Sequence, residues 1–197
     1  GIGRAIAVEL AKRGASLVLM GRDAGHIALA AGIAGGVDVI LIPEIPYNID
    51  SIAKKIAAVK AGGRNFSLVV VSEAVKTLDG DPQQVTFSDG QMRYGGIGHY
   101  IGDQIFRATG SETRVTVLGH VQRGSSPTYN DRLLASAFGV RAVDLIAEGK
   151  FDRMVAWKNR QVVDVPIEAA IAAYQAVDTN SSLVHTARAL GISLGDD

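Results

Sequence analysis

The segment VDVILIPEIPYNIDSIAKKIAAVKAGGRNFSLVVVSE, residues 37–73, decides the fold of this chain, because it reads as a strand, a helix and a second strand. The apolar runs at its two ends, 37–42 and 66–72, are short, continuous and rich in β-branched residues. Runs of this kind are typical of strands buried on both faces. Between them, Asp50 and Ser51 can cap a helix that a glycine pair ends just beyond residue 60.

The same alternation continues on both sides of this segment. Strands are expected at 15–20, 113–119, 154–158 and 161–165, and helices at 2–13, 24–34, 97–108, 130–147 and 181–190. A polar, glycine-rich loop is expected from the end of the strand at 66–72 to about residue 96. The pattern predicts an α/β fold, in which a parallel sheet is covered by helices on both faces.

Composition excludes several classes of protein. The chain has 197 residues, of which 47% are hydrophobic, so it can bury a core. Its 20 basic and 20 acidic residues cancel, so no overall field attracts nucleic acid or an anionic membrane. The apolar stretch 24–42 contains His26 and Asp38 and is expected to be a helix and a strand, not a membrane span. Without cysteine there is no disulfide framework, which is compatible with the cytoplasm.

Charged side chains follow four of the expected parallel strands, and the carboxyl ends of such strands meet at one edge of a sheet. Arg22 follows the first of these strands, Glu73 the third, and His120 with Arg123 the fourth. Arginine and histidine can donate hydrogen bonds to phosphate oxygens, whereas a carboxylate accepts them from sugar hydroxyls. Glu44, after the second strand, is expected to cap a helix or form a salt bridge. A phosphate-binding site is therefore predicted at this edge.

Long motifs at these positions resemble a known family. MGRDAGHIALAAGIAGG (20–36), ILIPE (40–44), VVVSE (69–73) and ETRVTVLGHVQRGSSPTYNDRLLAS (112–136) closely resemble the carboxyl-terminal, sugar-phosphate-binding half of 6-phosphofructokinases. The resemblance extends from about Met20 to the C-terminus. It implies a domain over 20–197 that binds fructose 6-phosphate, which the family phosphorylates on the 1-hydroxyl in glycolysis, in the cytoplasm.

The resemblance also implies roles for individual residues. Arg22 contacts the substrate and lies near the transferring phosphoryl group, which makes it the one candidate for a catalytic role. Glu73 binds sugar hydroxyls, whereas Arg114 reaches the 6-phosphate bound by a neighbouring subunit, so a homo-oligomer is implied. The substrate-binding residues implied in this way are Met20, Gly21, Arg22, Glu73, Arg114, His120 and Arg123.

The donor side of the family's reaction has no counterpart in this sequence. The family uses ATP or pyrophosphate with Mg²⁺, bound through a GGD-type loop, a GGDGS segment and a TIDND-like segment whose first Asp is the general base. None of these motifs occurs here, and no metal ligands are assigned. Phosphoryl transfer depends on positioning the donor and neutralising its charge. The chain alone is therefore expected to transfer nothing, and it has no expected nucleic-acid or membrane partner.

The first 19 residues depart from this pattern. GIGRAIAVELAKRGASLVL resembles the first helix and second strand of short-chain dehydrogenases, packed here as part of the same domain. An NADP-binding dehydrogenase is thus one alternative, in which Arg22 would contact the adenosine 2′-phosphate of NADP. The catalytic pair of these dehydrogenases is a Tyr with a Lys four residues later. This pair is absent, because none of the five tyrosines is followed by Lys at that distance. A non-catalytic α/β domain is the other alternative.

Overall fold

The computed structural model describes residues 17–19, 24–86, 92–118, 126–172 and 176–197. These residues form two compact units. The larger unit contains the described residues up to 118 together with 176–197, and the smaller unit contains 126–172. Each unit is described by itself.

A parallel three-stranded sheet forms the centre of the larger unit. Its strands are β1 (Leu17–Leu19), β2 (Val39–Leu41) and β3 (Val69–Ser72), in the order β1-β3-β2. Leu19 pairs with Ser72, and Leu41 pairs with Val71, so all three strands end near the same edge. This arrangement confirms the parallel sheet predicted from the continuous apolar runs.

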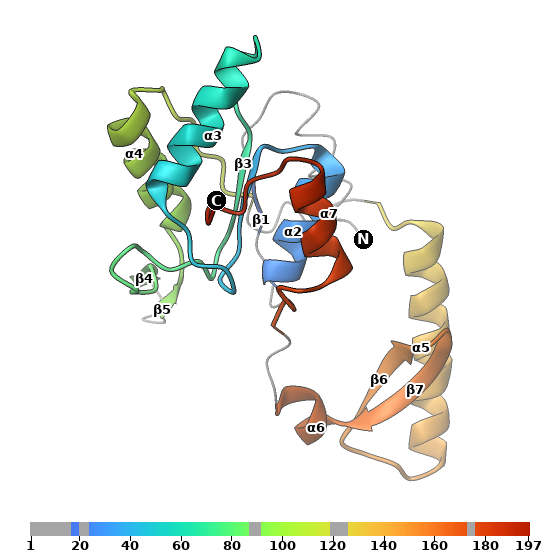
Figure 1. The fold of residues 1–197 in the computed structure, drawn as a ribbon. Coiled ribbons are helices and arrows are strands. Elements are labelled where there is room, and N and C mark those ends of the chain that lie inside the picture. The colour runs from blue at the N-terminus through green and yellow to red at the C-terminus, as the bar shows by residue number, and fades with distance from the viewer. Residues whose placement is uncertain (1–16, 20–23, 87–91, 119–125, 173–175) are drawn as a thin grey trace. The chain divides into compact units, whose positions relative to one another are not determined.

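Four helices cover the sheet on its two faces (Figure 1). Helices α2 (Ala24–Gly35) and α7 (Ser182–Ala189) pack on one face, and α3 (Ile49–Ala61) and α4 (Ile97–Thr109) pack on the other. Neighbouring residues of a strand point to opposite faces, so β2 and β3 supply both cores. Ile40 and Val70 belong to the core beneath α2, whereas Val39, Leu41 and Val71 belong to the core beneath α3 and α4. The predicted fold class is confirmed.

The N-cap of helix α3 lies two residues before Asp50, the first predicted cap residue. The side chain of Asn48 accepts a hydrogen bond of 2.7 Å from the backbone amide of Asp50, so Asn48 is the N-cap and Asp50 lies in the first turn. At the other end the amide of Gly62 donates to the carbonyl of Ala58, as the predicted glycine stop requires. The cap was misplaced because Asn, Asp and Ser occur together here and all three favour the N-cap.

Two stretches of the larger unit differ from the sequence prediction. The expected loop before residue 96 contains an antiparallel pair, β4 (Gln84–Thr86) and β5 (Met92–Tyr94). Conversely, the expected strand at 113–119 forms no regular strand over its described part, 113–118. Thr113 donates its hydroxyl hydrogen bond to the carbonyl of Gly102 in α4 instead. This segment therefore packs along a helix that has no side chain at that point.

The smaller unit consists of a long helix, a hairpin and a short helix. These are α5 (Tyr129–Ala147), β6 (Arg153–Lys158), β7 (Gln161–Pro166) and α6 (Ile167–Ile171). Thr128 and Asp131 form a capping box at the start of α5, in which each side chain accepts a hydrogen bond from the other residue's backbone amide. The predicted helix at 130–147 and both predicted strands are thus confirmed.

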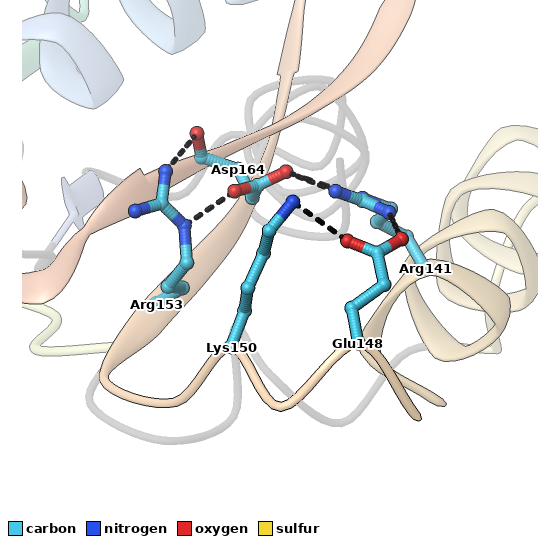
Figure 2. Close-up of polar contacts among 5 residues, drawn as sticks. All are labelled: Arg141, Glu148, Lys150, Arg153 and Asp164. Carbon is cyan, nitrogen blue, oxygen red and sulfur yellow. Dashed lines mark hydrogen bonds and ion pairs between the residues drawn. The ribbon is translucent and has the colours of Figure 1, made fainter. Parts of the chain in front are cut away.

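Charged side chains connect α5 to the hairpin (Figure 2). Asp164 on β7 accepts hydrogen bonds from Arg141 on α5, at 2.6 Å, and from Arg153 on β6. Glu148 accepts from Arg141 at 2.9 Å and from Lys150 at 2.8 Å. Each carboxylate is thus shared by two cations, and the network holds the helix and the hairpin together.

Several predictions concern residues outside the described ranges. They are the helix at 2–13, most of the dehydrogenase-like segment and residues 20–23, so the division at residue 19 stays a prediction. None of the helices in the described part of the chain combines the length and apolar character that crossing a bilayer requires.

Candidate functional site

The carboxyl edge of the sheet holds Glu73, one of the two predicted site residues that the structure describes. Glu73 directly follows the last residue of β3, and its side chain is half-buried. Burial raises the pKa of the Glu73 carboxyl above its usual value. A carboxylate held at a strand end can accept hydrogen bonds from ligand hydroxyls, and its partial burial strengthens such bonds.

Two buried hydroxyls occur near the carboxyl ends of β2 and β3, and neither was predicted from the sequence as a site residue. Ser72 is fully buried, and its hydroxyl has no hydrogen-bond partner among the described residues. The hydroxyl of Tyr47, in the loop after β2, is also buried without a partner there, and burial raises the pKa of Tyr47 to about 12. A buried polar group without a partner is costly, so these hydroxyls are candidates for ligand contact.

A weak signal for Ser72 exists in the sequence. Ser72 is the polar residue that ends the apolar run VVVS, directly before Glu73. It pairs with Leu19 of β1, whose next residue in the chain is Met20. The position of Ser72 at the end of a buried strand therefore indicates, from the sequence alone, that its side chain lies at this edge.

Glu44 follows β2 and has a structural role at this edge. Its carboxylate lies so close to the first turn of α2 that a methyl group at Gly25 would come within 2.5 Å of Oε2. Oε1 accepts a hydrogen bond of 3.0 Å from the backbone amide of Val177. A negative charge at a helix N-terminus is favourable, so the expected capping role agrees with this position.

Arg114 lies elsewhere. Its side chain is 86% exposed and forms an ion pair of 3.2 Å with Glu112. Arg114 lines a cavity together with residues 65–69, at the amino end of β3, whereas Glu73 follows the carboxyl end of that strand. The structure therefore does not bring Arg114 and Glu73 together within one chain.

The cavity that includes Arg114 has a volume of about 710 Å³. Lys60 and Arg64, from the end of α3 and the residues after it, add two more cations to its lining, and Glu112 supplies a carboxylate. Arg64 is held by the buried carboxylate of Asp38, which also accepts a hydrogen bond of 2.8 Å from the amide of Leu68. Predictions based on strand ends missed these cations, because they precede a strand.

Met20, Gly21, Arg22, His120 and Arg123 lie outside the described residues. Among the residues that the structure describes, no three carboxylate or histidine side chains lie close enough to hold a metal ion.

Comparison with known proteins finds similar sequences and similar structures. The family model described as Phosphofructokinase matches residues 10–146. An "ATP-dependent 6-phosphofructokinase 1" of Synechocystis sp. is 64% identical over 181 residues, which cover 92% of this chain and 50% of that protein. The chain thus spans about half the length of the curated relatives it matches.

Solved structures share the fold. Phosphofructokinase from Pichia pastoris in the T-state matches with a TM-score of 0.65 and 28% identity, over 97% of this chain and 21% of that one. A pyrophosphate-dependent phosphofructokinase from Nitrosospira multiformis matches with a TM-score of 0.69 over 98% of this chain and 54% of that one. At 22% identity the second likeness concerns the fold alone.

Proposed function

The chain belongs to the phosphofructokinase family, and from this we propose that it is the fructose 6-phosphate-binding part of a 6-phosphofructokinase. In the complete enzyme the bound sugar phosphate receives a phosphoryl group on its 1-hydroxyl, in a glycolytic reaction of the cytoplasm. The observation that carries the proposal is Glu73, a half-buried carboxylate at the carboxyl edge of the parallel sheet.

The chemistry of this edge suits a sugar. Glu73 accepts hydrogen bonds from sugar hydroxyls, and the buried hydroxyl of Ser72 offers another donor or acceptor beside it. A site of this kind discriminates by hydrogen bonding, because a ligand without the matching hydroxyls leaves buried polar groups unpaired.

Cationic residues complete the proposed site. Arg22 and Arg123 contact phosphoryl oxygens, since guanidinium groups match them with two parallel hydrogen bonds. Arg22 also stabilises the charge on the transferring group. Met20, Gly21 and His120 contact the sugar phosphate. The support for these assignments is that the segments 20–22 and 120–123 carry the family's motifs.

Arg114 serves the site of a neighbouring subunit, so the proposed enzyme is a homo-oligomer. Two observations support this role: Arg114 is exposed, and it lies at the end of β3 opposite Glu73. A residue in that position meets a ligand at the carboxyl edge only if that edge belongs to another copy of the chain.

The donor site is not part of this proposal. The family implies ATP or pyrophosphate together with Mg²⁺, but the donor motifs and the general-base Asp are absent from the sequence. We therefore derive no transfer step and assign this chain the binding and orientation of the acceptor. The alternative of an NADP-binding dehydrogenase gains no support from the matches, which are phosphofructokinases.

A ligand titration tests the proposal. A ligand that binds only the folded chain raises its melting temperature by mass action. Fructose 6-phosphate is expected to raise the melting temperature, whereas fructose, inorganic phosphate and NADP⁺ at the same concentration leave it unchanged. A rise with NADP⁺ alone would favour the dehydrogenase, and no rise with any ligand would favour the non-catalytic domain.

Arg123→Ala sharpens the test. The substitution is expected to weaken fructose 6-phosphate binding by about 1.5–3 kcal/mol, the contribution of hydrogen bonds to a charged group. Arg107→Ala is the matched control, because Arg107 is exposed on α4 and pairs only with Asp103 among the described residues. Equal affinities of the two variants in calorimetry would remove Arg123 from the site.

A further inference from the structure

The hydroxyl of Tyr47 is covered by other parts of the larger unit. Its oxygen has almost no exposed surface and no hydrogen-bond partner among the described residues. The ring of Tyr47 packs against the core that contains Val71 and Val75, the residues on either side of Ser72 and Glu73. A buried, unpaired hydroxyl is costly, and a ligand can reach this one only if the residues that cover it move.

Tyr47 itself is held in place. Gly195, with a positive φ of 85°, lies so close that a methyl group on it would come within 2.7 Å of the Tyr47 Cβ atom. The next amide along the chain, that of Asn48, donates a hydrogen bond of 2.7 Å to the carbonyl of Gly195. Asn48 is also the N-cap of α3. Movement that uncovers the hydroxyl must therefore come from the other side.

The other side is formed by residues 76–82, named here the 76–82 loop. Its two ends, Lys76 and Pro82, form an antiparallel bridge. Within the loop, the amide of Thr77 donates a hydrogen bond of 2.9 Å to the carbonyl of Asp81. The hydroxyl of Thr77 accepts a second one, of 3.2 Å, from the amide of Asp81. The loop is thus closed on itself and can move as one piece.

The 76–82 loop is weakly attached to the rest of the larger unit. Six of its seven residues are exposed. Among the described residues one hydrogen bond joins its tip to a helix, from the amide of Leu78 to the hydroxyl of Tyr100 in α4, and at 3.3 Å it is long. Burial, then Tyr100 and then Asp79 raise the pKa of Tyr47, so the loop lies near the hydroxyl. Segments with so few buried contacts open more easily than a core.

We propose that the 76–82 loop is a lid over the hydroxyl of Tyr47, and that Tyr47 is a further contact of the sugar-phosphate site once this lid opens. The closed lid leaves the hydroxyl unpaired, which limits the stability of the closed form. In the open form the hydroxyl donates a hydrogen bond to an oxygen of the ligand. The identity of the ligand rests on the proposed function, whereas the lid does not.

Tyr47→Phe tests both parts, because it removes the hydroxyl and keeps the ring. The closed lid then covers no unpaired group, so the amides of Thr77, Gly80 and Asp81 should exchange with solvent at least about fivefold more slowly than in the unchanged chain. The variant should also bind fructose 6-phosphate about three- to tenfold less tightly in calorimetry, since one donor is lost. A tyrosine with a structural role alone would not slow exchange and weaken binding together.

Two further variants set the direction of these effects. Tyr100→Phe removes the acceptor of the Leu78 amide, so the same loop amides should exchange faster. Tyr129→Phe is the matched control, because the side chain of Tyr129 is 78% exposed in the smaller unit, and it should change neither loop exchange nor affinity. Exchange of the β2 and β3 amides should be the same in all three variants, which shows that they are folded.

The possible failures differ from one another. Loop exchange as fast in Tyr47→Phe as in the unchanged chain would show that the 76–82 loop is not a lid over this hydroxyl. Equal affinity of these two proteins for fructose 6-phosphate would remove Tyr47 from the site and leave the proposed function standing. No binding by the unchanged chain would contradict the proposed function and the contact from Tyr47, but not the lid, which the exchange rates test without ligand.

Discussion

The two units of this chain stabilise themselves in different ways. The larger unit buries alternate residues of β2 and β3 in two separate cores under four helices. The smaller unit buries Leu145, and ion pairs around Asp164 join its helix to its hairpin. Burial of apolar area is the larger contribution to stability, because ion pairs in contact with water contribute little. The larger unit should therefore be the more stable of the two.

Removing a core side chain should give the largest effect. Leu29 on α2 is fully buried in the core that includes Ile40 and Val70. Leu29→Ala is expected to lower the free energy of unfolding by about 2–5 kcal/mol, from lost apolar burial and the cavity left behind. Leu133→Ala, at an exposed leucine of α5, is the control and should change it little. Equal effects in urea denaturation would contradict the comparison.

Acid should loosen the smaller unit through the ion pairs around Asp164. Hydrogen bonds from Arg141, and then from Arg153, hold the pKa of Asp164 below its usual value. A lowered folded-state pKa means that the stabilisation is present above the unfolded value, about 3.9, and is lost as the pH falls through the folded value. Exchange of the β6 and β7 amides should therefore accelerate in that acidic window.

The variant Asp164→Asn should reproduce this loosening at neutral pH. It removes the charge that Arg141 and Arg153 share, so exchange of the β6 and β7 amides should be faster than in the unchanged chain. Asp103→Asn removes an exposed ion pair on α4 and serves as the control. Unchanged exchange in β6 and β7 would mean that the network does not hold the hairpin.

The smallest effect on stability is expected at the proposed site, where the substitution should stabilise the chain, whereas the preceding variants should destabilise it. Burial raises the pKa of Glu73, so the charged form is penalised in the folded chain and this penalty disappears as the pH falls through the raised value. Glu73→Gln should make the chain slightly more stable at neutral pH and bind fructose 6-phosphate less tightly. A variant that is less stable and binds equally well would indicate a structural role for Glu73.

Most of the larger unit could be predicted from the sequence, because its signals are local. Continuous apolar runs indicated β2 and β3, and capping residues with glycine stops indicated the helices between them. The segment 113–118 was predicted wrongly as a strand, since its alternating pattern does not reveal that Gly102 leaves room for it along α4. Pairing with a distant element is a tertiary effect that propensity does not contain.

The site was predictable only in part. The strand-end argument correctly places Glu73 at the carboxyl edge, because parallel strands align their ends. It cannot reveal that Arg114 lies at the opposite end of β3, or that the hydroxyl of Ser72 is buried without a partner among the described residues. The separation into two units also escaped prediction, since no linker composition marks residue 126.

The central claim is that fructose 6-phosphate binds at the carboxyl edge of the sheet. The most direct measurement is an amide chemical-shift titration of the full chain with fructose 6-phosphate. The account predicts saturable shifts at Ser72 and Glu73 and none in β6 and β7. Absence of shifts at Ser72 and Glu73 at saturating ligand, or shifts confined to the cavity around Arg64 and Lys60, would contradict it.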